Sequence, residues 1–188
     1  MTLVFVSGRP SLDFVGTLKW RRGENAEEQL IKPALLSDWA RGAGLVNEPV
    51  SVNSGDLAQA IEMREALYRI VCTRLTGQHV DNADLDLLNS HARRQPVTPQ
   101  LLPNGRVRRR ASTLQLLASV ALDTLDLLAG TDMNRVRECS STDCTRLYID
   151  TSRSRNRRWC GMTECGNRAK AQTFRQRHKA STTTTMSR

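Results

Sequence analysis

Two cysteine pairs of equal spacing, Cys139-Ser-Ser-Thr-Asp-Cys144 and Cys160-Gly-Met-Thr-Glu-Cys165, decide the fold of the C-terminal part of this 188-residue chain. Four residues separate the cysteines within each pair, and fifteen residues separate the two pairs. Zinc prefers four tetrahedral ligands, and two cysteine-bearing turns supply two thiolates each. We therefore predict that Cys139, Cys144, Cys160 and Cys165 bind one structural Zn²⁺. Four protein ligands leave no coordination position open, which argues against a hydrolytic metal site.

Two other uses of the four cysteines remain open. A redox-switched disulfide pair is the main alternative, and an iron–sulfur cluster fits less well because the ligands lack the tighter spacings usual there. The N-terminal sequence MTLVFVSGRP has no basic leader or cleavage site, and no apolar run approaches the ~18 residues of a membrane span. We therefore expect a cytoplasmic protein, in which a metal site is favoured over disulfides. Because so small a module has little core, metal binding is expected to supply most of its folding free energy.

Positive charge is concentrated in the same part of the chain. Residues 135–188 contain 13 Lys and Arg against 4 Asp and Glu, whereas residues 1–134 contain 15 of each kind. The whole net charge of +9 therefore lies in the C-terminal part. Such a distribution indicates a polyanionic partner, since clustered Lys and Arg displace counterions from a phosphate backbone. The plainer alternative is a solvated tail that keeps the protein soluble.

Basic side chains flank the second cysteine pair on both sides. Four arginines precede Cys160, and a helix predicted to reach about residue 179 follows Cys165. Arg and Gln on such a helix are able to read guanine and adenine edges in a major groove, while the four arginines suit phosphate contacts. We expect Trp159 and Phe174 to pack in the core of the module. The predicted nucleic-acid-binding residues are Arg153, Arg155, Arg157, Arg158, Arg168, Lys170, Gln172, Arg175 and Lys179.

The first part of the chain is predicted to be helical. Apolar residues recur with helical periodicity in segments 35–45, 56–75, 81–92 and 112–128. Residues 3–14, around Gly8-Arg9-Pro10, and residues 97–110, around Asn104-Gly105, are predicted to form β-hairpins. Leucines surround most of the last helix, which indicates a central helix covered on more than one side.

The expected fold class is mainly α with small β-hairpins (α+β), in three parts. A helical domain at residues 1–132 is expected to sense a ligand or to mediate assembly. A four-cysteine zinc finger with a basic helix follows at residues 135–180, and a disordered tail at residues 181–188. Within the first domain, Ser37 and Asp38 are candidate N-terminal caps of the first helix.

One arginine lies in the middle of a predicted apolar helix face. Arg64 projects from the centre of the apolar arc of the helix 56–75, where a charge is costly unless it is paired. We predict a buried ion pair with Asp13, and the alternative is an arginine that binds an anionic ligand. The candidate residues of a ligand pocket are Asp13, Trp20 and Arg64.

The C-terminal stretch resembles the CGNR zinc finger, named after a motif present here as Cys165-Gly166-Asn167-Arg168. This resemblance extends through Asp150, Ser152, Arg158, Trp159, Cys160, Met162 and Lys170. The N-terminal part resembles the ABATE domain, on Leu12-Asp13-Phe14, Thr17, residues 36–45 and the run Met63-Arg64-Glu65-Ala66-Leu67-Tyr68. The resemblance implies a stress-induced transcription regulator whose finger binds zinc.

A DNA-binding transcription regulator is the leading functional hypothesis, with double-stranded DNA as the partner. A nonspecific or RNA-binding zinc protein would have the same charge pattern, and a redox or metal sensor would use the four cysteines as its switch. A small-molecule effector and a homodimer that reads two half-sites are further expectations, and no membrane partner is expected. No enzyme activity is expected, because no nucleophile or metal-hydrolase pattern contains His79, His91 or His178.

Overall fold

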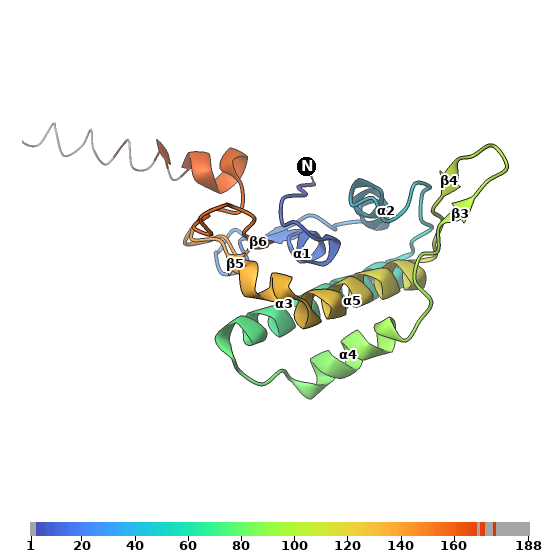
Figure 1. Ribbon diagram of the computed structural model, residues 1–188, viewed down its shortest axis with the longest axis horizontal. Helices are drawn as coiled ribbons and strands as arrows, with labels where there is room; N and C mark the ends of the chain where they lie inside the picture. Colours follow the sequence, from blue (N-terminus) through green and yellow to red (C-terminus); the bar gives the residue numbers. More distant parts are fainter. Residues whose placement is uncertain (1–2, 169, 172–174, 176–188) are drawn as a thin grey trace, which may run out of the picture.

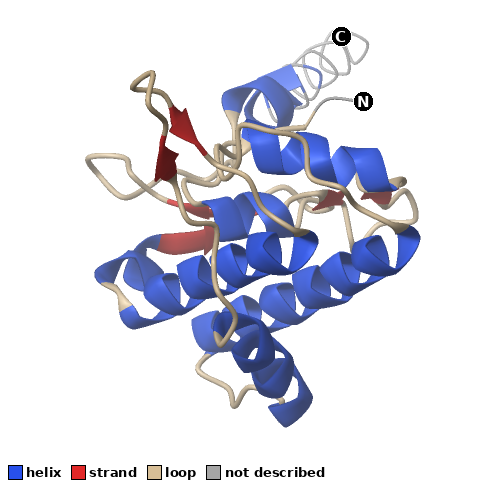
Figure 2. Ribbon diagram, turned by 90° about the vertical axis from the view of Figure 1, so that its right-hand side faces the viewer, coloured by secondary structure: helices blue, strands red, loops and turns tan. Residues whose placement is uncertain are grey.

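The computed structural model describes residues 3–168, 170, 171 and 175. In this part of the chain helices make up most of the regular structure, and the strands form short antiparallel pairs (Figure 1, Figure 2). The predicted fold class, mainly α with small β-pairs, is confirmed. The predicted helix end near residue 179 and the tail at residues 181–188 lie outside the described residues. No helix among those described is both long enough and apolar enough to cross a membrane.

Two long helices, α3 and α5, form the centre of the fold. They contact each other, α4 packs against both, and α1 contacts both from the opposite side (Figure 1). α5 therefore touches three other helices, as its distribution of leucines predicted. The helices are α1 (Pro10–Val15), α2 (Pro33–Gly42), α3 (Ser54–Thr76), α4 (Asn82–Ala92) and α5 (Thr113–Ala129).

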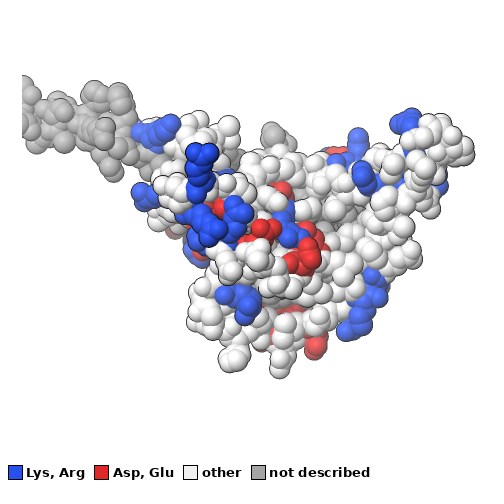
Figure 3. Space-filling model, in the orientation of Figure 1, with Lys and Arg blue, Asp and Glu red and all other residues white. Residues whose placement is uncertain are grey.

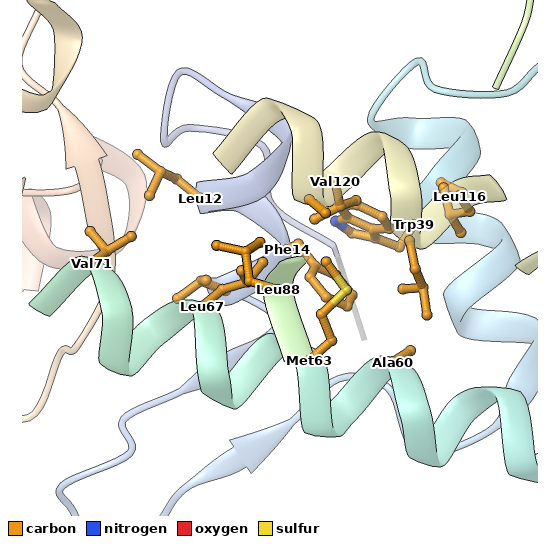
Figure 4. Close-up of a cluster of buried hydrophobic side chains, with 14 of the residues drawn as sticks. Leu12, Phe14, Trp39, Ala60, Met63, Leu67, Val71, Leu88, Leu116 and Val120 are labelled. Carbon is orange, nitrogen blue, oxygen red and sulfur yellow. The ribbon is translucent and has the colours of Figure 1, made fainter. Parts of the chain in front are cut away.

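The hydrophobic core lies between these helices (Figure 4). The rings of Phe14 from α1 and Trp39 from α2 lie 4.7 Å apart between centroids, which joins the two shorter helices to the long pair. Burying such apolar side chains contributes roughly 1.5–3 kcal/mol each. Among the most buried core side chains are Leu12, Phe14, Leu36, Trp39, Met63, Leu67, Leu88, Leu116 and Val120.

Capping boxes fix where α3 and α5 begin. Asn53 Oδ1 accepts a hydrogen bond from the backbone N of Asp56, and the Asp56 carboxylate accepts one from the backbone N of Asn53. Ser112 and Gln115 make the same exchange at the start of α5. Each box satisfies two backbone donors that a helix start leaves without partners. α3 ends before Gly77, which adopts a left-handed conformation with a φ of 70°.

The predicted hairpin at residues 3–14 is wrong, because α1 begins at Pro10. A proline at the first helical position fixes a helical φ. It lacks a backbone N–H, but an N–H at this position has no acceptor within the helix. Pro33 begins α2 in the same way, four residues before the predicted cap Ser37. The Ser37 hydroxyl instead accepts a hydrogen bond of 2.9 Å from the backbone N of Val50, inside the fold.

The strands form three separate two-stranded antiparallel sheets. They pair β1 (Leu18–Lys19) with β2 (Glu27–Glu28), β3 (Gln100–Leu101) with β4 (Val107–Arg108), and β5 (Val136–Glu138) with β6 (Leu147–Ile149). The predicted hairpin at residues 97–110 is confirmed, with Gly105 in its turn at a φ of 76°. A 3₁₀ turn at Thr131–Arg135 leads from α5 into β5.

The β5–β6 pair packs directly against the helical part of the chain. Val136, Leu147 and Ile149 belong to the same buried cluster as the core of the helices. The backbone N of Ile149 also donates a hydrogen bond of 2.8 Å to the carbonyl oxygen of Ser7, in the segment before α1. The helical part and the cysteine-bearing part therefore share one hydrophobic core.

Candidate metal centre

Four thiols converge beside the β5–β6 pair. The Sγ atoms of Cys139, Cys144, Cys160 and Cys165 all lie within 4.8 Å of one another, and all four residues are buried. Cys160 Sγ lies 3.8 Å from Cys144 Sγ and 3.6 Å from Cys165 Sγ. A disulfide requires an S–S distance of about 2.0 Å. The four cysteines are therefore free thiols.

The spacing of the four sulfur atoms fits a tetrahedral metal ion. Zinc–sulfur bonds of about 2.3 Å in a tetrahedron place the sulfur atoms about 3.8 Å apart, close to the two distances measured. The thiolate is the form of cysteine that binds a metal ion. Four thiolates fill the coordination sphere, so this set of residues suits a structural metal ion and offers no open position for a substrate.

The strand pair brings the first two cysteines together. Cys139 directly follows β5, and Cys144 lies three residues before β6. Antiparallel pairing of these strands continues to the cysteines, since the backbone N of Cys139 donates to the carbonyl oxygen of Arg146 at 3.0 Å. The two cysteines are therefore the two ends of one short hairpin loop.

The second pair is carried by a tight π-helical turn at Met162–Gly166. The backbone N of Gly166 donates to the carbonyl oxygen of Gly161 at 2.9 Å, which closes the turn. The backbone N of Cys160 donates to Cys139 Sγ at 3.4 Å and thereby links the two pairs.

Aromatic side chains cover the cysteine cluster. Tyr148 of β6 is fully buried against it, and burial raises the pKa of Tyr148 to about 12. Trp159 packs on the cluster as predicted, whereas Phe174 lies outside the described residues. The sequence pattern gave no indication that Trp20, from the helical part of the chain, also packs on the cluster. The metal centre is therefore partly enclosed by a residue more than 100 positions away in the sequence.

Asp150 shapes the loop between the strand pair and the second cysteine pair. Its Oδ1 accepts hydrogen bonds from the backbone N and the hydroxyl of Ser152, at 2.9 and 2.6 Å. Its Oδ2 accepts one of 3.0 Å from the backbone N of Arg157. The hydrogen bond from the Ser152 hydroxyl, together with the backbone donors, lowers the pKa of Asp150 and keeps it ionised at neutral pH. One carboxylate thus fixes both ends of an arginine-rich loop.

The four arginines of this loop fall into two classes. Arg153, Arg155 and Arg158 are exposed and form no ion pair within the described part of the chain; the Arg158 guanidinium lies 5.4 Å from the Trp159 ring. The Arg157 guanidinium instead points inward and donates to the carbonyl oxygens of Trp159, Cys160 and Val6. Arg157 also lies over the Tyr148 ring at 4.3 Å. It therefore fastens the loop to the finger and to the N-terminal segment.

The remaining predicted nucleic-acid-binding residues follow Cys165. Arg168 is exposed and lies 5.2 Å from the Trp20 ring, and Lys170 and Arg175 are exposed as well. Gln172 and Lys179 lie outside the described residues. Positively charged side chains gather over the β5–β6 region on the face that Figure 3 shows.

The ion pair predicted between Arg64 and Asp13 is wrong. Arg64 is buried, at 1% exposure, and its guanidinium donates to both carboxylate oxygens of Glu28 at 2.7 Å and to Glu65 at 2.8 Å. Asp13 Oδ1 accepts hydrogen bonds from the backbone N atoms of Val6 and Ser7. Helical periodicity correctly indicated that Arg64 is a buried charge in need of a partner. That partner, Glu28, lies in the short strand β2, which no sequence pattern predicted.

The three candidate pocket residues do not line a common cavity among the described residues. Trp20 borders a cleft of about 300 Å³ where the helical part meets the finger. Asp13 and Arg64 are buried within their own hydrogen-bonded groups and do not line that cleft. The lining residues of the cleft are Trp20, Gly23, Glu24, Asn25, Asp143 and Arg168.

Two family models match the chain, and no curated protein does so significantly. The ABATE model, described as "Putative stress-induced transcription regulator", matches residues 8–131, which hold the five helices. The CGNR zinc finger model matches residues 135–178, which hold the four clustered thiols. The resemblances drawn from the sequence are thereby confirmed. The chain belongs to the ABATE family, and its ABATE domain is followed by a CGNR zinc finger that supplies the four-cysteine metal site.

Proposed function

We propose that the protein is a zinc-dependent, DNA-binding regulator of transcription, in which one structural Zn²⁺ holds the finger in shape. The observation that carries this proposal is the set of exposed arginines around the closed four-thiol site, Arg153, Arg155 and Arg158, which form no ion pair among the described residues. Arginine displayed in this way binds phosphate groups strongly because its planar guanidinium donates two parallel hydrogen bonds.

The metal centre would favour DNA binding by fixing the backbone on both sides of the arginine loop. Zn²⁺ would join the loop after β5 to the π-helical turn, and the arginine loop lies between these two segments. Asp150 and Arg157 hold that loop from inside, so its exposed arginines are placed before DNA arrives. Preplaced side chains lose less conformational entropy on binding, and this supports the loop as a phosphate-binding element.

Arg168 and Lys170 would extend the contact surface beyond the metal centre. Both follow the π-helical turn and are exposed. Arginine on a helix is able to read guanine edges in the major groove, whereas the loop arginines suit phosphate contacts. In this proposal the loop positions the finger on the duplex, and the helix after Cys165 supplies base contacts.

The experiment that tests this function is selection of bound sequences from a random duplex-DNA pool by the zinc-loaded protein at near-physiological salt. A reproducible motif supports sequence-specific DNA recognition. Salt-sensitive binding without a motif would replace it with nonspecific or RNA binding, which competition with single- and double-stranded RNA would separate. Absence of any nucleic-acid binding would overturn the proposal.

A further inference from the structure

A second group of arginines lies far from the finger in the sequence. Residues 87–122 contain no Asp or Glu but six arginines, of which four are clustered in the stretch Arg106-Val-Arg108-Arg109-Arg110. The overall neutrality of residues 1–134 conceals this cluster, because acidic residues elsewhere balance it. The cluster forms the second strand and the base of the β3–β4 hairpin.

The hairpin is a firmly attached arm. Its turn contains Gly105 at a φ of 76°, a conformation that glycine adopts without strain. Asn47, in the loop after α2, holds the second strand: its side-chain amide donates to the carbonyl oxygen of Val107 at 2.7 Å, and its Oδ1 accepts from the backbone N of Arg109 at 2.8 Å. In Figure 1 this arm lies at the end of the molecule opposite the β5–β6 pair.

The arginines of the arm lack anionic partners. Within the described part of the chain, the side chains of Arg106, Arg109 and Arg110 form neither an ion pair nor a hydrogen bond, and that of Arg108 donates only to the neutral Gln100. By contrast, the arginines that stabilise the helical part meet carboxylates at 2.5 to 3.2 Å: Arg9, Arg21, Arg64 and Arg69. Unpaired guanidinium groups close together repel one another and attract an external polyanion.

The shape of the arm suits a nucleic-acid groove. Strand β4 ends at Arg108, and Arg109 and Arg110 follow it at the base of the ribbon. Leu101 and Val107 are partners across the hairpin and are 75% and 45% exposed, which gives the ribbon an apolar pair beside its charges. A two-stranded ribbon fits a DNA groove, where basic side chains contact phosphates and apolar ones contact bases.

We propose that the β3–β4 arm is a second contact with duplex DNA, which adds phosphate contacts to those of the zinc finger. This inference rests on the proposed function, because it assumes that the finger binds DNA. A hollow of about 570 Å³ at the base of the arm, lined in part by Arg108 and Arg110, leaves room for a phosphate group. The arm lies in the ABATE domain, so the domain takes part in DNA binding directly.

The test compares the variant R106Q/R109Q/R110Q with the control R74Q/Q78E/N82D. Both lower the net charge by three, and the control positions are exposed residues at the junction of α3 and α4. Affinity for duplex DNA is measured as a function of salt, and thermal unfolding verifies that both variants fold. The arm variant is expected to flatten the slope of log K against log salt by roughly 0.9 for each phosphate that is no longer bound, about 2.7 in all, while the control keeps the wild-type slope.

Each other outcome overturns a different statement. Unchanged binding by the arm variant, or equal weakening of the arm variant and the control, would overturn the arm as a contact and leave the function of the finger intact. The arm would also be overturned as a contact if its substitutions weakened binding only in a protein whose finger arginines were replaced as well. Two distant contacts with one duplex should contribute additively to the binding free energy. Absence of DNA binding by the wild-type protein would overturn both the proposed function and this inference.

Discussion

Arg64 shows how a single buried charge organises the helical part of the chain. Its guanidinium is almost fully enclosed, and two carboxylates, from Glu28 and Glu65, neutralise it. Burial disfavours ionisation of Glu28, but the hydrogen bonds from Arg64 and from the backbone N of Leu30 outweigh burial and lower the pKa of Glu28. Glu28 is therefore a carboxylate at neutral pH and ties the loop between α1 and α2 to α3.

We expect Glu28→Gln to lower the free energy of unfolding by about 2 kcal/mol at pH 7, because the substitution removes hydrogen bonds to a buried charge. The neighbouring Glu27→Gln is the control, since Lys19 Nζ lies 3.5 Å from Glu27, whereas Arg64 donates two hydrogen bonds of 2.7 Å to Glu28. The control substitution should therefore have the smaller effect. Urea unfolding measures both values. Equal effects of the two substitutions would show that the Arg64 pair is not a stabilising contact.

The same pair predicts a pH dependence. A carboxylate with a lowered pKa in the folded state stabilises the protein above its ordinary pKa, and this contribution disappears as the pH falls through the lowered value. The difference in stability between the wild-type protein and Glu28→Gln should therefore shrink as the pH falls below about 4. A difference that stays constant from pH 7 to pH 3 would contradict the assignment of Glu28 as the ionised partner.

Among the elements of secondary structure, those determined by local interactions were predicted from local sequence patterns. Periodicity located α3, α4 and α5, and the Asn104-Gly105 pair located the β3–β4 turn. The start of α1 at Pro10 was missed because two short apolar runs flank a Gly-Arg-Pro turn signal. The partners of α1, which bury its apolar residues, are distant in the sequence, so a local pattern could not identify it as a helix.

The exposed arginines of the loop between Asp150 and Cys160 should contribute to the salt dependence of DNA binding. Replacing Arg153, Arg155 and Arg158 with Gln should flatten the salt dependence of DNA binding by roughly 0.9 for each phosphate that these side chains no longer bind. Arg157→Gln is the matched comparison, because the Arg157 guanidinium is bound inside the finger. That variant should lower the thermal unfolding midpoint, which the triple variant should leave unchanged. A triple variant with the wild-type salt slope would place the DNA contact elsewhere.

In the whole molecule, the helical part and the cysteine-bearing part pack against each other. The convergence of the four cysteines was predicted from their spacing, because two closely spaced pairs suit one tetrahedral ion. The docking of the finger was not evident, since it depends on Val136, Leu147 and Ile149 entering the core of the helices and on Trp20 covering the thiols. These are long-range contacts without a local sequence signal.

This shared core predicts that removing the metal also loosens the helical part. Cys160→Ser should raise the hydrogen-exchange rates of the backbone amides of Val6, Ser7 and Ile149, which bond the N-terminal segment to Asp13 and to β6. Cys72→Ser is the control, because Cys72 lies in α3 outside the metal cluster. Unchanged exchange at Val6 and Ser7 in the Cys160→Ser variant would instead establish the finger as an independent module.

The molecule as a whole carries exposed arginines at two ends of a body in which other arginines are paired with carboxylates (Figure 1, Figure 3). We propose that a bound metal ion shapes the surface that binds DNA. The decisive experiment measures the duplex-DNA affinity of the intact protein with Zn²⁺ bound, after chelation, and after Zn²⁺ is restored. We expect chelation to abolish most of the affinity and one equivalent of Zn²⁺ to restore it. Affinity that is indifferent to chelation, in protein verified to be metal-free, would contradict this proposal.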